Sequence, residues 1–219
     1  YIGGKTNSKN FLPLPKNANM LIVRQTYKNR ILQTHAKINI KTSNTSPIPE
    51  PLTGVKLENQ LNQSLAFVSG TASTFLRWVH EFKKNHLNQL PLGDQDFFQA
   101  AGGDPKICYL HGYFDFDDDE YMEITTEIPD CEYWNFQLEN HWMESLDYRH
   151  YPIHINESSA DLNKDKSITI NVSHSPEKLK NNLITEGRKN GAMLLRWIGA
   201  TSFPIPTVEI KKLNSLQDR

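Results

Sequence analysis

Apolar and polar positions alternate with a period of two through much of the second half of the chain, which predicts β-strands with one buried face. Seven segments follow this pattern and are separated by turn residues: 106–114, 121–128, 132–140, 152–155, 167–174, 192–199 and 207–213. Two further strands are expected earlier, beginning at Met20 and covering 36–41. Short strands in such close succession indicate an antiparallel sandwich or barrel.

Residues 55–86 have a different period. Their apolar side chains recur three and four positions apart, which is the spacing of one helix face. Because Ser69 and Gly70 permit a break, the segment is expected to form one kinked helix or two helices. Trp78 and Phe82 share a face and are expected to pack in the core. Residues 88–105 are expected to form a loop.

The length of 219 residues fits one domain spanning 1–219, with 55–100 as a helical insertion and loop within it. The 24 basic and 25 acidic residues nearly balance, which argues against a nucleic-acid partner and a polybasic membrane anchor. No apolar run approaches the ~20 residues that cross a bilayer, and no signal peptide is visible. These features do not determine the cellular location of the protein.

The segment 133–140 has two contrasting faces. One carries the core residues Trp134, Phe136 and Leu138, and the other carries Tyr133, Asn135, Gln137 and Glu139. A polar face of amides beside an aromatic ring either meets solvent or lines a cavity, where amides would recognise a ligand. The second interpretation makes Tyr133, Asn135 and Gln137 candidate ligand-binding residues.

The segment 144–149 gathers an acid, a hydroxyl, a second acid, a phenol and a base within six residues. Such a cluster either forms an acid/base site or a turn whose charges satisfy one another. In the first case Glu144 or Asp147 is the general base, and His174 shuttles the proton. Tyr148 and Arg149 are candidate ligand contacts.

Arg196 lies in a strand whose two faces are both apolar, so its guanidinium is expected to be buried and to need a partner. Asp147 and Glu144 are the expected partners; the alternative is a cavity that binds an anion. No metal and no cofactor are expected, because the eight histidines and two cysteines lack metal-site spacing. Cys108 and Cys131 are expected to be buried thiols.

The run 133–138 with Trp142 and 144–149 resembles the signature of the domain-of-unknown-function family numbered 1214. Other matching pieces are Gly112-Tyr113-Phe114, His174, Arg196-Trp197, Pro204 and Pro206. The resemblance implies a mainly β, antiparallel jelly-roll sandwich with a helical insertion, in mostly bacterial proteins of unknown function. It also implies a further β domain N-terminal to this one in many members.

The chain departs from that family's pattern at two positions. Where members typically carry an acid and a histidine, this chain has Ile184 and Arg188. Arg188 becomes a candidate ligand contact, and an enzymatic role inherited from the family is weakened.

Three functions follow as hypotheses. The leading one is a pocket beside 133–140 for a small organic or amphipathic ligand, which is anionic if Arg149, Arg188 or Arg196 face it; whether the ligand is hydrolysed stays open. The others are a non-catalytic carbohydrate-binding module and a structural part of a larger chain or homo-oligomer.

Overall fold

The computed structural model describes residues 2–3, 7, 9–18, 21–41 and 51–213. The chain falls into two compact units, 1–44 and 45–219. In the first unit the described residues contain one isolated bridge, between Ile2 and Leu12, and no strand. The strand expected in 36–41 is therefore wrong. The strand expected to begin at Met20 is also wrong over residues 21–23. Met20 itself lies outside the described residues.

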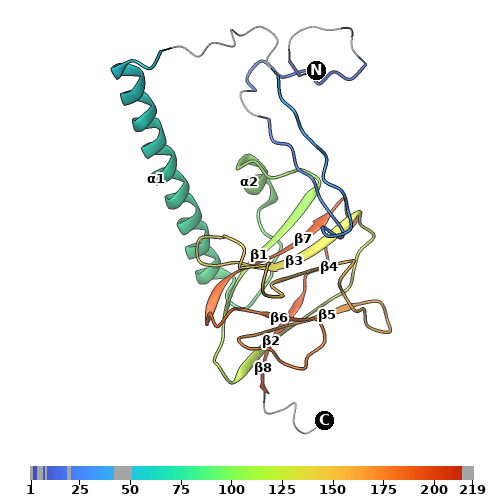
Figure 1. Cartoon of the computed structure of the whole chain (residues 1–219). Coiled ribbons are helices and arrows are strands. Elements are labelled where there is room, and N and C mark those ends of the chain that lie inside the picture. The colour runs from blue at the N-terminus through green and yellow to red at the C-terminus, as the bar shows by residue number, and fades with distance from the viewer. Residues whose placement is uncertain (1, 4–6, 8, 19–20, 42–50, 214–219) are drawn as a thin grey trace. The chain divides into compact units, whose positions relative to one another are not determined.

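The second unit holds two four-stranded sheets (Figure 1). The first has the order β1-β7-β3-β4, built from Ile107–Asp115, Asn190–Ile198, Tyr133–Leu138 and His154–Asn156. The second has the order β6-β5-β2-β8, built from Asn182–Ile184, Ile168–Ser173, Glu120–Thr126 and Thr207–Lys212. All pairs are antiparallel except β5 with β6.

All seven segments predicted as strands in 106–213 contain one. The short parallel strand β6 was not predicted, and neither was the helix α2 (Gln95–Ala100), which lies in the expected loop 88–105. Asp94 caps α2 by accepting a hydrogen bond from the backbone N–H of Phe97, at 3.0 Å. The mainly β class with little helix is confirmed.

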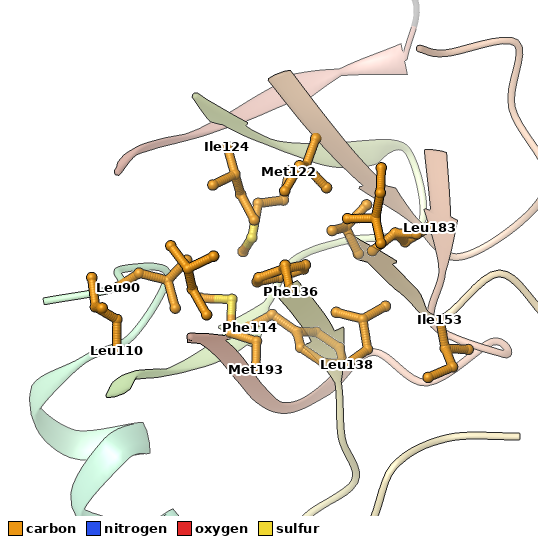
Figure 2. Packing of buried hydrophobic residues seen from close by; sticks show 14 of the residues in the cluster. Leu90, Leu110, Phe114, Met122, Ile124, Phe136, Leu138, Ile153, Leu183 and Met193 are labelled. Atoms are coloured by element: carbon orange, nitrogen blue, oxygen red, sulfur yellow. The ribbon is translucent and has the colours of Figure 1, made fainter. Parts of the chain in front are cut away.

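The two sheets share one core of alternating side chains. Figure 2 shows Met122 and Ile124 of β2 facing Phe114, Phe136 and Met193 of the other sheet. Trp134 and Trp197 are completely buried beside them, with ring centroids 6.3 Å apart. The indole N–H of Trp197 donates to the carbonyl of Pro204 at 3.2 Å, so the buried polar atom is satisfied. This core fixes which side chains of β1, β3 and β7 point outward.

The helix α1 (Gly54–Asn85) is one continuous helix of 32 residues, so of the two forms expected for 55–86 the pair of separate helices is wrong. Thr53 caps it by accepting from the N–H of Lys56 at 3.2 Å. Its last turns bury Val79 and Phe82 against the outer face of the first sheet, with Phe98, Tyr113 and Ala192. Trp78 packs against this cluster, which confirms the expected core role of Trp78 and Phe82.

The segment after α1 runs against β1. Asn88 N–H donates to the carbonyl of Tyr113 at 2.7 Å, and Tyr113 N–H donates to that of His86 at 3.2 Å. The side chain of Asn88 also bonds both backbone groups of Asp115. Gly112 makes this approach possible, because a Cβ there would lie 2.0 Å from the carbonyl oxygen of Gln89.

Candidate functional site

The side chains that alternate with the core residues of β3 lie on the outer face of the first sheet. Strand register places Arg196 of β7 between Asn135 of β3 and Tyr109 of β1. Asn156 of β4 lies opposite Asn135. Asn135 is only 8% exposed and Gln137 is partly buried. This polar face is therefore largely withdrawn from water.

A chain of hydrogen bonds crosses this face. Arg196 Nη1 donates to Gln137 Oε1 at 3.1 Å, and Gln137 Nε2 donates to Glu139 Oε1. Arg196 therefore has Gln137 as a hydrogen-bond partner. Arg196 was expected to pair with Asp147 or Glu144, and this expectation is wrong. Asp147 is bound to Arg149, and Glu144 is bound to Asn140.

Glu139 is the residue of this face that sequence reasoning passed over. It is 2% exposed, and its Oε2 has no hydrogen-bond partner. Burial raises its pKa from 4.5 to about 7, although Arg196 and the bond from Gln137 act to lower it. Its N–H donates to the carbonyl of Ala192 at 2.8 Å, which holds it beside the apolar cluster under α1. The only signal in the sequence was its parity with Gln137.

His111 of β1 is a second buried titratable group on the same face. Its ring stacks on Phe82, with centroids 4.8 Å apart and planes at 7°. It is 4% exposed, and its Nδ1 has no partner. Burial, and then the positive charges of Arg196 and His86, lower its pKa to about 3. The imidazole is therefore neutral across the physiological range.

A pocket of about 340 Å³ lies where two loops meet, and it contains most of the predicted acidic and basic cluster. Its lining residues are Asn140, Ser145, Leu146, Asp147, Tyr148, Arg149, Glu186 and Arg188. Asn140 shapes one loop, because its Oδ1 accepts from the N–H groups of Trp142 and Glu144 at 2.8 and 3.1 Å. Its Nδ2 donates to the carboxylate of Glu144 at 2.8 Å. Glu144 is thus exposed, bound to Asn140, and not among the lining residues.

Two carboxylate–guanidinium pairs occupy the pocket wall. Arg149 donates to both oxygens of Asp147, through Nε and Nη2, each at 2.9 Å. This bidentate bond is the first cause that lowers the pKa of Asp147 to about 2. Glu186 accepts the backbone N–H of Asp147, and its other oxygen lies 3.6 Å from Arg188 Nη2. The hydrogen bond from the N–H of Asp147 to Glu186 links the two loops.

His174 is engaged on both sides of its ring. Nε2 donates to the carbonyl of Phe116 at 3.0 Å, so in the neutral ring Nδ1 accepts the hydroxyl of Thr185 at 2.8 Å. The ring also stacks on Phe116, 4.2 Å away. His174 contacts neither Glu144 nor Asp147, so the structure does not assemble the predicted acid/base trio. Through its bond to Thr185, His174 instead holds the segment that leads into Glu186.

The described part of the chain offers no ready metal site: among those residues, no three His, Cys, Asp or Glu side chains converge. Cys108 is buried and Cys131 partly buried, and neither forms a disulfide. Burial raises the pKa of the Cys108 thiol to about 11, which makes it a poor nucleophile. Neither described helix is long and apolar enough to cross a membrane.

The chain has the fold of a solved but uncharacterised protein from Burkholderia cenocepacia. The TM-score is 0.91 at 35% sequence identity, over 98% of this chain and 59% of that one. The chain thus spans about three-fifths of that relative's length. A second solved structure, the VPA0106 protein from Vibrio parahaemolyticus, matches with a TM-score of 0.43 and 14% identity, over 76% of this chain and 48% of that one. No family model matches the chain, and no curated protein matches it.

Proposed function

We propose that the pocket between residues 140–149 and 186–188 binds a small organic ligand that carries an anionic group. The observation that carries this proposal is the state of Arg188. Among the residues that the structure describes, its guanidinium has no hydrogen bond, and its ion pair with Glu186 is long at 3.6 Å. Glu186 is meanwhile held by the N–H of Asp147. A ligand carboxylate or phosphate would give Arg188 the bidentate partner that it lacks.

The volume of about 340 Å³ fits a small molecule. Ser145 and Tyr148 supply hydroxyl groups along the same wall, and these can accept or donate hydrogen bonds. In the family that the chain resembles, a histidine is typical at the position of Arg188. This chain carries a permanent positive charge there, which favours an anionic ligand.

Binding is favoured over hydrolysis in this pocket. Asp147 has a pKa of about 2, so it stays ionised and is a weak base near neutral pH. His174, the predicted proton shuttle, is bonded to Thr185 and Phe116. The pocket therefore works as a binding module.

We also propose that the chain belongs to family 1214 and has the jelly-roll topology. The two four-stranded sheets support the topology, and the place of residues 145–149 in the pocket wall supports the family membership.

The proposal is tested by replacing Arg188 with glutamine. Wild-type protein is titrated with small carboxylates, organic phosphates and neutral sugars, and binding is followed by thermal shift and by calorimetry. For any anion that binds wild type, Arg188→Gln should weaken the affinity by about 10- to 100-fold, because a hydrogen bond to a charged group is lost.

Lys189→Gln is the matched control. Lys189 is the next residue, it is exposed, and it pairs with Asp118 at 3.2 Å instead of lining the pocket. Its replacement removes the same charge and should leave the affinity within about twofold. Equal weakening by both variants would show a diffuse charge effect and contradict the proposed site. Binding of neutral sugars alone would favour the carbohydrate-module hypothesis instead.

A further inference from the structure

One face of α1 carries an apolar stripe that continues far beyond the part packed on the sheet. Its members are spaced alternately four and three residues apart, the heptad spacing of paired helices. They are Leu61, Leu65, Val68, Ala72, Phe75, Val79 and Phe82. Val79 and Phe82 are buried against the first sheet, whereas Leu61, Leu65 and Val68 are 61%, 69% and 64% exposed. We call these seven residues the α1 stripe.

The part of α1 that holds the exposed half of the stripe also lacks charge. Residues 59–76 contain no Asp, Glu, Lys or Arg, although the chain has 49 such residues among its 219. An exposed helix normally carries charges on its solvent side. Depletion of charge with retention of large apolar side chains is instead typical of the centre of a protein–protein interface. This half of α1 therefore has the composition of a covered surface.

A heptad stripe is matched by another helix with a heptad stripe, and α1 matches itself. When two copies run antiparallel about a two-fold axis between Ala66 and Phe67, Leu65 meets Val68 of the second copy. Leu61 meets Ala72 of the second copy, so large side chains face smaller ones. An interface around a two-fold axis must be self-complementary in this way. The neutral flanking residues bring no like charges together, and antiparallel helix dipoles attract.

The size of the surface is adequate. The six exposed apolar side chains on and beside the stripe, Leu57, Leu61, Leu65, Val68, Phe75 and Leu76, are 37–69% exposed. Together they offer on the order of 600 Å², and the flanking polar residues bring this near the ~800 Å² per partner of a stable interface. The apolar surface also continues past Trp78 onto Phe97, which is 49% exposed and whose ring centroid lies 5.1 Å from that of Trp78.

We propose that the protein forms a homodimer in which the α1 stripes of two copies pair antiparallel. The interface is centred on Leu65 and Val68, and the β-sheets lie at opposite ends of the helix pair. This inference is independent of the ligand proposed above.

The test compares two charge insertions of identical spacing. Leu61→Glu/Leu65→Glu places two carboxylates in the stripe, and Asn59→Glu/Gln63→Glu places two on the opposite face of the same turns. In sedimentation velocity over roughly 1–100 μM, wild type and the Asn59/Gln63 variant should sediment as dimers, and the Leu61/Leu65 variant as a monomer. Circular dichroism of both variants checks that α1 still forms.

A cross-link tests the direction of pairing. In the antiparallel pair Asn62 lies beside Ser69 of the second copy, so Asn62→Cys/Ser69→Cys should form a covalent dimer on mild oxidation. Ser69→Cys alone should not, because the two Ser69 positions lie about 7.5 Å apart along the axis, which with the gap between the helices exceeds the reach of a disulfide. Wild type, with its own two cysteines, gives the background.

Three outcomes would overturn the proposal: a monomeric wild type at 100 μM, a dimer that survives the Leu61/Leu65 change, or cross-linking by Ser69→Cys alone. A monomer in which the Leu61/Leu65 change lowers the melting temperature, while the Asn59/Gln63 change does not, would assign the stripe to another segment of the same chain.

Discussion

Replacing Glu139 by glutamine is expected to change the pH dependence of stability by about 3 kcal/mol between pH 4.5 and 7. The carboxyl titrates near 4.5 when the chain is unfolded and at about 7 when it is buried in the fold. Between these values the folded state holds a proton that the unfolded state has released. Stability therefore falls as pH rises through this window, by about 1.4 kcal/mol per unit, and glutamine removes that loss.

The measurement is urea unfolding of wild type and Glu139→Gln at half-unit steps from pH 4 to 8.5. The quantity compared is the difference in unfolding free energy between the two proteins, which should move in favour of the variant as pH rises and then level off above about pH 7.5. His111 acts in the opposite direction: its pKa of about 3 in the fold makes stability fall as pH drops below 6.5. The difference cancels this second contribution.

Glu132→Gln is the matched control, since it removes an exposed carboxyl from the segment just before β3. Its curve shows how the unfolding free energy changes with pH when one exposed acidic group is lost. A difference curve for Glu139→Gln that follows the Glu132→Gln curve would show that Glu139 is solvated in solution, and the buried chain from Arg196 through Gln137 would have to be abandoned.

The second large effect is expected at Gly112, where alanine should lower the unfolding free energy by about 3 kcal/mol or more. The new Cβ would lie 2.0 Å from the carbonyl oxygen of Gln89 and 2.8 Å from the end of Met193. Because the nearer obstacle is backbone, the segment 86–90 has to move away from β1. Its hydrogen bonds to Tyr113 and Asp115 would then weaken together.

Gly70→Ala is the paired measurement for the same chemical change. Gly70 lies within α1 with no atom near the position of a Cβ, on the side away from the α1 stripe. Alanine there should raise stability by about 0.5–1 kcal/mol through helix propensity. Chemical denaturation gives the unfolding free energy of both variants. Similar small changes in this free energy at Gly112 and Gly70 would mean that 86–90 does not cross β1 as closely as described.

The alternating residues of β3 illustrate how far sequence reasoning reached. Trp134, Phe136 and Leu138 had to share a buried face, and the structure buries all three. The chemical partners of the opposite face were out of reach, because they depend on which strand lies next to β3. Gln137 meets Arg196 only because β7 pairs with β3 between β1 and β4. Strand order is a long-range property that a local period does not contain.

Errors elsewhere have equally physical causes. Residues 36–41 alternate as a strand would, but alternation describes one chain, and a strand also needs a hydrogen-bonding neighbour. β6 escaped notice because three residues are too few to show a period. The separation into two helices at Ser69-Gly70 did not occur, since one glycine costs a helix only about 1 kcal/mol and 32 residues can absorb that.

The balance of charge in the pocket wall affects how a ligand would arrive. Asp147 and Glu186 offset Arg149 and Arg188, and the whole chain carries a formal charge of only −1. At distances beyond about 10 Å an approaching anion would feel little attraction. Association should therefore proceed at the ordinary rate of an unsteered encounter and respond weakly to ionic strength. Discrimination among ligands would arise after contact, from how well each one fits the guanidinium of Arg188.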